Sequence, residues 1–172
     1  MTGRIEELEI RPAREEDLPA ITAIFNYAIE HTTAAWTEEP VSEANRHVWL
    51  EDHRKRALPV IVAQAEGLVL GFGALSVFRD WPGYCDTVEN SVYVHPAAWS
   101  KGVGSQLLAQ LIKEAAKCQK HSIVAAISAD NQTSIDLHRK MGFSWCGALP
   151  EVGIKAGNRL DLAFLTYTLG ES

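Results

Sequence analysis

Cysteines are few in this sequence, and no motif uses them. The three cysteines, Cys85, Cys118 and Cys146, are widely spaced, and no Cys-x-x-Cys pair occurs. An odd number of scattered cysteines argues against a disulfide framework and is typical of a protein of the reducing cytoplasm. The six histidines include no His-Glu-x-x-His motif and form no cluster with cysteine, so we expect no bound metal.

Long apolar runs and an excess of basic charge are also missing. No stretch of about 18 apolar residues occurs, which excludes a membrane-spanning helix. Charged residues interrupt the opening MTGRIEELEI, so we expect it to be neither a secretory signal nor a membrane anchor. The formal net charge is −6, whereas proteins that bind nucleic acids or anionic membranes usually carry a basic excess. We therefore expect neither of these as a partner.

The remaining composition is that of a globular protein. The chain has 172 residues, of which 47% are hydrophobic and 22% are charged. This length suits one domain with a sizeable core, so we expect a single domain over residues 1–172.

Hydrophobic periodicity predicts the elements of the first half of the chain. Ser42 is expected to open a helix in which Val48 and Trp49 face the core. The predicted strands between residues 59 and 94 are joined by short connections or a loop, which favours an antiparallel meander. The expected elements are a strand at 8–12, a helix at 17–31, a loop at 32–40, a helix from Ser42 to about 57, and strands at 59–63, 68–78 and 87–94.

The second half has a different pattern. An amphipathic helix at 103–118 precedes an apolar strand at 122–128, which is followed by a helix at 131–141 that Gly142 ends. This order predicts a βαβ unit with a parallel strand pair. Strands at 145–149 and 160–169 complete an α/β fold with a mixed central β-sheet flanked by helices.

A glycine-containing loop, Trp99-Ser-Lys-Gly-Val-Gly-Ser105, lies directly before the long helix. Gly102 and Gly104 let backbone N–H groups turn toward one point, and the unpaired donors of the first helical turn attract an anion. Lys101 adds a positive charge. The loop alone also fits an ordinary turn, and it is not a Walker P-loop.

A second motif, Asn131-Gln-Thr-Ser134-Ile-Asp-Leu-His138-Arg-Lys-Met-Gly142-Phe143, begins one strand later. Ser134 and His138 are four residues apart and share a helix face. The glycine loop, one strand and then this motif closely resemble the GNAT superfamily of N-acetyltransferases. The resemblance implies the GNAT fold and acetyl-CoA as a cosubstrate.

The resemblance also implies roles for individual residues. The loop would hold the CoA pyrophosphate, the strand would pair with the pantetheine arm, and the second motif would contact that arm. Two positions depart from the family pattern: Trp99 stands where Gln or Arg is usual, and His138 where Tyr is frequent. The implied cofactor-binding residues are Val92, Tyr93, Val94, Ser100, Lys101, Gly102, Val103, Gly104, Ser105, Asn131 and Ser134.

Five segments resemble the phosphinothricin N-acetyltransferase branch, which includes enzymes acting on methionine sulfoximine and methionine sulfone. These segments are residues 33–42, 78–81, 87–96, 137–138 and 152–155. The branch implies a homodimer and a small L-amino-acid acceptor that is acetylated on its α-amine. The implied acceptor-binding residues are Trp36, Arg79, Trp81, Glu89, Asn90 and Ser91.

The chemistry of such an acceptor fits these residue types. Only a neutral amine attacks a thioester, so Glu89 is a candidate base. Arg79 could clamp the acceptor carboxylate, and His138 could protonate the leaving thiolate or serve as a second base.

Each of these residues also has a structural interpretation. Glu89 could be a solvent-facing strand residue, Arg79 could pair with Asp80, and His138 could be a packing residue. Trp36 and Trp81 could be core or interface aromatics, and Lys155 is expected in solvent. The alternative functions are acetylation of a polyamine, an aminoglycoside or a protein N-terminus, and a non-catalytic acyl-CoA sensor.

Overall fold

The computed structural model describes residue 5 and residues 7–170. Part of the opening segment, residues 1–4 and 6, lies outside the described residues. The helices are α1 (Leu18–His31), α2 (Glu43–Lys55), α3 (Val103–Lys117) and α4 (Gln132–Lys140). The strands are β1 (Glu9–Pro12), β2 (Val60–Ala65), β3 (Leu68–Val77), β4 (Thr87–Val94), β5 (Ser122–Ser128), β6 (Ser144–Lys155) and β7 (Asn158–Thr168).

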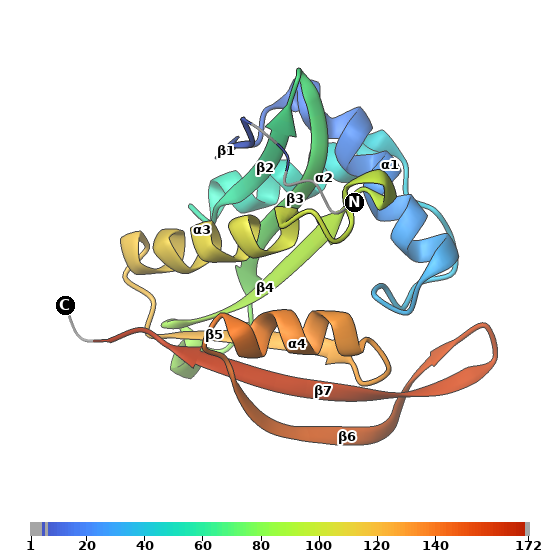
Figure 1. The fold of residues 1–172 in the computed structure, drawn as a ribbon. Coiled ribbons are helices and arrows are strands. Elements are labelled where there is room, and N and C mark those ends of the chain that lie inside the picture. The colour runs from blue at the N-terminus through green and yellow to red at the C-terminus, as the bar shows by residue number, and fades with distance from the viewer. Residues whose placement is uncertain (1–4, 6, 171–172) are drawn as a thin grey trace.

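The seven strands form one mixed sheet in the order β1-β2-β3-β4-β5-β7-β6 (Figure 1). Strands β2 to β4 form the predicted antiparallel meander, and β4 and β5 are parallel neighbours joined through α3, as predicted. Strand β1 adds to the sheet antiparallel to β2. No helix within the described residues combines the length and apolar character needed to cross a bilayer.

Local signals account for several element boundaries. The Ser42 side chain accepts a hydrogen bond from the Asn45 N–H at 3.1 Å and caps α2, which confirms it as the helix start. Gly142 follows α4 with a φ of 95°, the left-handed conformation that ends a helix.

The C-terminal hairpin is longer than the sequence indicates. We predicted strands at 145–149 and 160–169, but β6 runs to Lys155 and β7 starts at Asn158. Pro150 and Gly153 suggest a break, yet β6 passes this point through a register irregularity between Leu149 and Gly153. The hairpin turns at Ala156 and Gly157, which both have a positive φ.

The prediction that Val48 faces the core was wrong. Its side chain is 68% exposed, whereas Leu50 and His53 of the same helix are buried. Successive helical residues are about 100° apart, so the buried stripe through Trp49, Leu50 and His53 places Val48 toward solvent.

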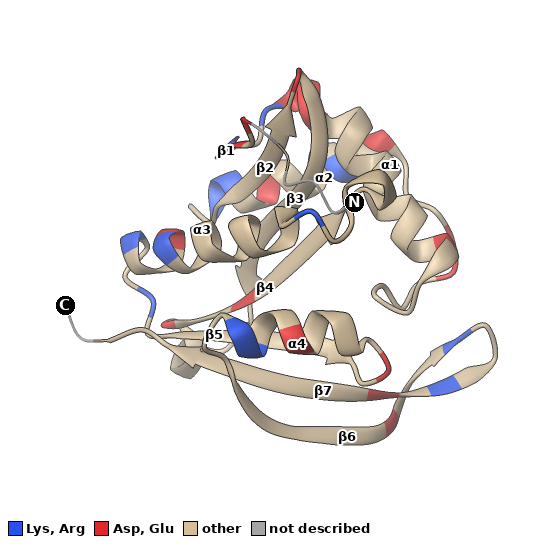
Figure 2. Ribbon diagram, viewed as in Figure 1, with Lys and Arg blue, Asp and Glu red and all other residues tan. Residues whose placement is uncertain are grey.

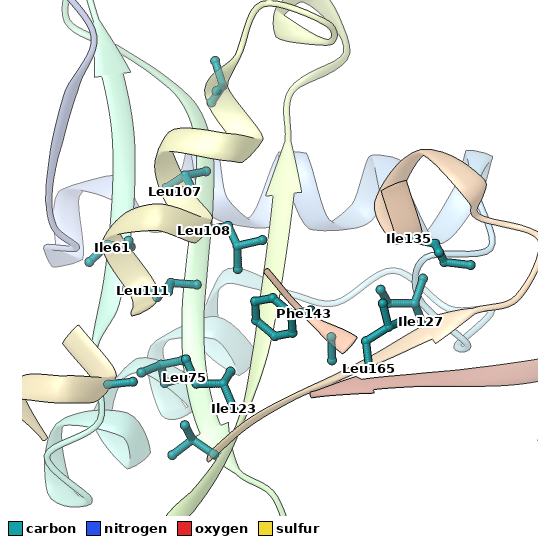
Figure 3. Packing of buried hydrophobic residues seen from close by; sticks show 14 of the residues in the cluster. Ile61, Leu75, Leu107, Leu108, Leu111, Ile123, Ile127, Ile135, Phe143 and Leu165 are labelled. Carbon is teal, nitrogen blue, oxygen red and sulfur yellow. The ribbon is translucent and has the colours of Figure 1, made fainter. Parts of the chain in front are cut away.

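Helices cover both faces of the sheet, and the larger core lies under α3. Figure 3 shows Leu107, Leu108 and Leu111 of α3 packed with Leu75 and Ile123 of the sheet. On the other face, Ile21 and Ile24 of α1 pack against Val62 and Phe72. We call these the α3 face and the α1 face.

Side chains of β4 alternate between the two faces. Val88, Val92 and Val94 belong to the core under α3, whereas Tyr93 packs against the cluster under α1. Asn90 therefore lies on the α3 face, and Glu89 and Ser91 lie on the α1 face.

The centre of the sheet is almost uncharged. Across β2, β3, β4 and β5, which are described in full, Glu89 is the one charged residue. Lys, Arg, Asp and Glu instead gather on the helices, the loops and the β6–β7 hairpin (Figure 2). A carboxylate placed in the middle of an apolar sheet is unusual and indicates a function.

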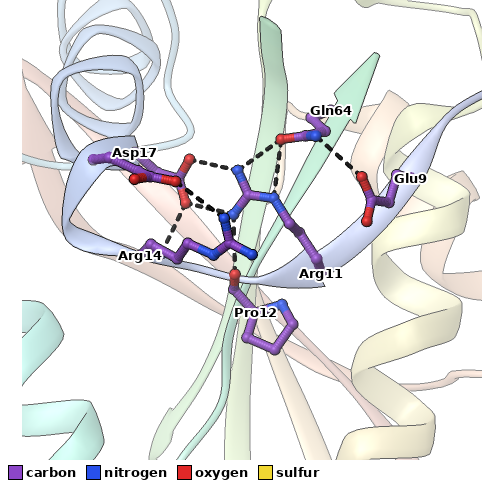
Figure 4. A network of polar contacts seen from close by, with 7 residues as sticks. Glu9, Arg11, Pro12, Arg14, Asp17 and Gln64 are labelled. Atoms are coloured by element: carbon purple, nitrogen blue, oxygen red, sulfur yellow. Dashed lines mark hydrogen bonds and ion pairs between the residues drawn. The ribbon is translucent and has the colours of Figure 1, made fainter. Parts of the chain in front are cut away.

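A buried ion pair ties the start of the chain to the sheet (Figure 4). The Arg11 guanidinium donates to both carboxylate oxygens of Asp17, at 2.7 and 2.8 Å, and its Nε donates to Gln64 at 2.9 Å. Burial alone would raise the pKa of Asp17, but the hydrogen bonds from Arg11 and from the Arg14 N–H lower it below the usual carboxyl value. The charged pair thus stabilises the folded state.

We predict that Asp17→Asn lowers the free energy of unfolding by about 3 kcal/mol at neutral pH, because Arg11 would keep a buried charge without a partner. A folded-state pKa below the unfolded value stabilises at pH values above about 4, and this contribution disappears as the pH falls through the folded pKa. Urea unfolding at about pH 7 and about pH 3 measures both effects. Glu16→Gln, which breaks the exposed pair with Arg14 at 3.1 Å, should change stability by less than about 0.5 kcal/mol. Equal losses in the two variants would contradict the prediction.

Candidate active site

Strands β4 and β5 pair over three positions and then separate. The paired residues are Thr87 with Ser122, Val88 with Ile123, and Glu89 with Val124. Beyond them β4 continues along β3 to Val94, and β5 continues along β7 to Ser128. Figure 1 shows the two strands diverging, with α4 beside β5. Within the described residues, the facing edges of residues 90–94 and 125–128 have no strand partner.

The hydrogen-bonding pattern shows which backbone groups of β4 face this separation. The His95 N–H donates to the Leu70 carbonyl at 2.8 Å. In an antiparallel ladder such bonds occur at alternate residues, so Glu89, Ser91 and Tyr93 also face β3. The N–H and C=O groups of Asn90, Val92 and Val94 face the β5 side. An open strand edge of this kind can bind an extended ligand that carries amide groups.

The glycine loop lies at the end of this edge and leads into α3. Ser100 and Gly102 have φ values of 61° and 86°, so two left-handed residues fall within three positions. Such conformations, together with the free N–H groups of a helix start, form a concave site for an anion. A Cβ at Gly102 would meet only Ser105 Oγ, at 3.9 Å, so this glycine leaves open space beside the loop.

Gly104 serves packing. A Cβ at this position would lie 3.3 Å from Leu137 of α4 and 3.6 Å from Val94 of β4. The missing side chain lets the first turn of α3 approach α4 closely. We expected both glycines to open the loop to a phosphate. In the structure Gly102 lies beside open space, whereas Gly104 lies against α4 and β4.

Trp99, which stands where the family usually has Gln or Arg, makes a backbone hydrogen bond. Its indole N–H donates to the Val94 carbonyl at 2.8 Å, while about half of its side chain stays exposed. The Val94 carbonyl is therefore already occupied, and the groups of Asn90 and Val92 remain along the open edge.

The second motif caps and orients α4. The Asn131 side chain accepts from the Ser134 N–H at 3.1 Å and caps the helix. Ser134 in turn offers its carbonyl to His138 Nδ1 at 2.8 Å.

His138 is buried and hydrogen-bonded on both ring nitrogens. Its Nε2 lies 2.9 Å from Asn90 Nδ2, and the Phe143 ring packs against it with centroids 4.9 Å apart. Asn90 Nδ2 can only donate and the Ser134 carbonyl can only accept, so both contacts fit a neutral imidazole with its proton on Nδ1. Burial lowers the pKa of His138, although the hydrogen bond to Ser134 opposes this shift.

Glu89 lies on the opposite face of the sheet, at the last paired position before β4 and β5 separate. Its register partner on β3 is Ser76. Burial raises the pKa of Glu89, and the nearby positive charge of Arg79 opposes this shift. The two expected proton-handling residues, Glu89 and His138, thus face different sides of the sheet.

Arg79 and Trp81 follow β3 and lie near the surface. Arg79 lines a cavity of about 340 Å³ together with Arg56, Ser76 and Asp80. Among the described residues, Arg79 has no carboxylate within ion-pair distance. The adjacent Asp80 lies 3.7 Å from Arg56 instead. The Arg79 guanidinium lies over the Phe78 ring at 5.2 Å. Trp81 is 75% exposed and projects from the surface.

The loop between α1 and α2 is anchored to two distant segments. Lys155 was expected in solvent, but it is half-buried and donates to the Thr32 and Ala35 carbonyls, both at 2.6 Å. Trp36 packs so closely against Gly153 that a Cβ at this position would clash with the indole ring. Thr33 donates to Asp130, just before α4, at 2.7 Å.

These anchors place Trp36 and its neighbours between the C-terminal hairpin and the β5–α4 connection. Sequence reasoning missed Lys155 and Asp130 because their contacts join residues 120 and 97 positions apart, which no local pattern reveals.

Among the described residues, no group of His, Cys, Asp or Glu side chains could hold a metal ion. The chemistry available at the site is therefore that of a half-buried carboxylate, a neutral imidazole, an arginine and open backbone groups.

Comparison with known proteins extends these observations. Residues 21–143 match the family model for the acetyltransferase (GNAT) family. The chain is 43% identical to an L-methionine sulfoximine/L-methionine sulfone acetyltransferase of Salmonella typhimurium, over 95% of this chain and 96% of that protein.

Two solved structures have the same fold. A phosphinothricin acetyltransferase of Sinorhizobium meliloti in complex with acetyl-CoA has a TM-score of 0.92 and 33% identity, covering 96% of this chain and 90% of that one. A ribosomal-protein-alanine N-acetyltransferase of Brucella melitensis has a TM-score of 0.93 and 46% identity, covering 94% and 99%. The family match and the shared fold agree with the glycine loop, the separated strands and the motif on α4, so this chain belongs to the GNAT family of acetyltransferases.

Proposed function

We propose that this protein transfers an acetyl group from acetyl-CoA to the α-amine of small L-amino-acid analogues such as methionine sulfoximine, methionine sulfone and phosphinothricin. The observation that carries the proposal is the path along the open edge of β4. It leads from the glycine loop to Glu89, the one charge in the four central strands. The Salmonella and Sinorhizobium relatives act on acceptors of this class by name.

The open edge and the loop fit the two ends of the CoA arm. Pantetheine carries amide groups, which can pair with the backbone of Val92 and with the Val94 N–H, whereas the backbone of Tyr93 between them faces β3. The pyrophosphate is an anion, which suits the loop from Ser100 to Ser105 and the charge of Lys101. Asn131 and Ser134, at the start of α4, would flank the arm from the β5 side.

Glu89 is the residue we assign to remove the proton from the acceptor. The bound ammonium must lose a proton before its nitrogen can attack the thioester carbon. A carboxylate whose pKa is raised by burial is a better match for this task than an ordinary one. The attack forms a C–N bond and an oxyanion. Collapse of the oxyanion breaks the C–S bond and releases the CoA thiolate. The attached nitrogen gives up its second proton, which the thiolate can take, and the neutral amide remains. A backbone N–H on the open edge, such as that of Val94, can stabilise the oxyanion.

The acceptor would bind on the α1 face, where Glu89, Ser91 and the anchored loop with Trp36 lie. Arg79 has no carboxylate partner among the described residues, so its guanidinium is available for the acceptor carboxylate. The Brucella relative acts by name on an alanine of a ribosomal protein, and a residue at a protein N-terminus has no free α-carboxylate. A contribution of Arg79 to acceptor binding would therefore distinguish amino-acid acceptors from protein N-termini.

We also propose a cytoplasmic homodimer. Strand β6 is an edge of the sheet and exposes four large apolar side chains, which favours an interface on this side. They are Trp145, Leu149, Val152 and Ile154. All three cysteines are free, as expected for a reducing compartment.

Gly102→Val should raise the KM for acetyl-CoA by at least about tenfold, equivalent to roughly 1.4 kcal/mol, because a side chain would fill the space beside the loop. Steady-state kinetics and a thermal unfolding scan measure the effect. Gly67→Val is a matched control, since Gly67 has a φ of 77°, close to the 86° of Gly102, and lies in the turn between β2 and β3. The control should share the backbone strain and keep the wild-type KM. An unchanged KM in folded Gly102→Val would remove the loop from the acetyl-CoA site.

Glu89→Gln should lower kcat by about 10²–10⁴ while leaving the affinity for acetyl-CoA nearly intact, because only the base is lost. Since burial raises the pKa of Glu89, the acidic limb of the kcat profile should lie above the usual carboxyl range. That limb should weaken or shift in the variant. The measurement is kcat against pH with methionine sulfoximine, and Glu66→Gln, on an exposed turn, is the control. A near-normal kcat with an unchanged profile would move the base elsewhere.

Arg79→Lys should raise the acceptor KM, because a point charge cannot replace a planar fork on a carboxylate. The unaltered enzyme should prefer methionine sulfoximine to its decarboxylated amine, and this preference should shrink in the variant. Paired kinetics with the two acceptors test both statements. Equal turnover of both acceptors by the unaltered enzyme would favour a polyamine, an aminoglycoside or a protein N-terminus as the natural acceptor.

A further inference from the structure

Two buried side-chain atoms have no hydrogen-bond partner among the described residues: Ser128 Oγ at the end of β5, and Oδ1 of Asn90 on β4. Asn90 is only 7% exposed. Asn90 is the first residue of β4 beyond its last pair with β5. Leaving a buried acceptor unpaired is unfavourable, so such an atom calls for an explanation.

The orientation of the Asn90 amide is set by His138. Asn90 Nδ2 donates to His138 Nε2 at 2.9 Å, and His138 Nδ1 donates to the Ser134 carbonyl at 2.8 Å. If the amide were rotated, Oδ1 would face the lone pair of Nε2, which is repulsive. A proton on Nε2 would remove that repulsion, but the neutral tautomer would then turn the Nδ1 lone pair toward the Ser134 carbonyl. Protonation of both nitrogens would create an imidazolium beside the Phe143 ring in a buried site. The imidazole therefore holds Nδ2 toward itself and turns Oδ1 away.

The side on which Asn90 lies indicates its ligand. Its side chain is on the α3 face with Val92 and Val94, next to the helices that carry the glycine loop and the second motif. Glu89 and the anchored loop are on the α1 face. An N–H donor reaching Asn90 Oδ1 would thus belong to the CoA arm, and the acceptor amine would approach from the other face.

We infer that His138 is a positioning residue, which fixes the amide of Asn90 so that Oδ1 accepts an N–H from the pantetheine arm of acetyl-CoA. The inference rests on the proposed function, since it places that arm along the open edge of β4. It also replaces the expected role of His138 as an acid: Nε2 carries no proton, and the Nδ1 proton is held by Ser134. The leaving thiolate needs little assistance, because an ordinary thiol has a pKa of about 8.5.

Substitution can separate positioning from proton transfer. The Gln side chain in His138→Gln can still accept from Asn90 Nδ2 through Oε1, but it cannot titrate. We expect His138→Gln to stay within about threefold of the unaltered protein in acetyl-CoA affinity and kcat. His138→Ala and Asn90→Ala should each weaken acetyl-CoA binding by about tenfold, measured by calorimetry, and the double variant should be no weaker than the single ones.

Asn45→Ala and His47→Gln, on the exposed side of α2, should change neither quantity. Additive losses in the double variant, or an equal loss of kcat in His138→Gln and His138→Ala together with a lost limb of the pH profile, would overturn the inference in favour of an acid–base role. Unaltered protein that does not bind acetyl-CoA would overturn the proposed function as well. Normal binding by Asn90→Ala would overturn this inference alone.

A spectroscopic measurement tests the tautomer without turnover. In a proton–nitrogen correlation spectrum of the imidazole rings, His138 should show a protonated Nδ1 and an unprotonated Nε2 from about pH 6 to about pH 8. Removing the donor in Asn90→Ala should shift the Nε2 signal. A proton on Nε2 in the unaltered protein would contradict the positioning role.

Discussion

The separation of β4 from β5 after Glu89 is the constraint on which the rest of the site depends. Three paired positions hold the two halves of the sheet together, and beyond them the facing edges have no strand partner. Backbone N–H and C=O groups at such an edge must bind water or a ligand. The loop that follows β4 ends this edge with Gly102 and the start of α3. One topological feature thus creates both a surface for an extended amide-bearing arm and an anion site at its end.

The alternation of side chains along β4 then divides the chemistry between two faces. Asn90 and the helices α3 and α4 lie on one face, and Glu89, Ser91 and the loop before α2 lie on the other. A donor and an acceptor that approach from opposite faces can meet only where the strands separate. The contacts of Lys155, Trp36 and Thr33 fix the loop between α1 and α2 on the acceptor side. The position of this loop therefore depends on the C-terminal hairpin.

The scarcity of charge in the sheet gives the few polar groups their properties. Burial raises the pKa of Glu89 and lowers that of His138, so in both cases the apolar surroundings favour the neutral form. For Glu89 the positive charge of Arg79 limits the rise in pKa and so favours the ionised carboxylate. For His138 no charge compensates, and the imidazole serves as a neutral hydrogen-bonding group. Two ionisable residues on opposite faces of the sheet therefore differ in their roles because their neighbours differ.

The sequence by itself determined the features that depend on neighbours along the chain. Hydrophobic periodicity predicted α3, β5 and the meander, Ser42 and Gly142 marked helix ends, and the glycines before α3 indicated an anion site. Tertiary structure decided the rest. The outward direction of Val48, the full length of β6, the contacts of Lys155, and the pairing of Asn90 with His138 arise between segments far apart in the sequence. Local periodicity reports which side of an element is apolar, but only the packed sheet determines which distant polar groups meet.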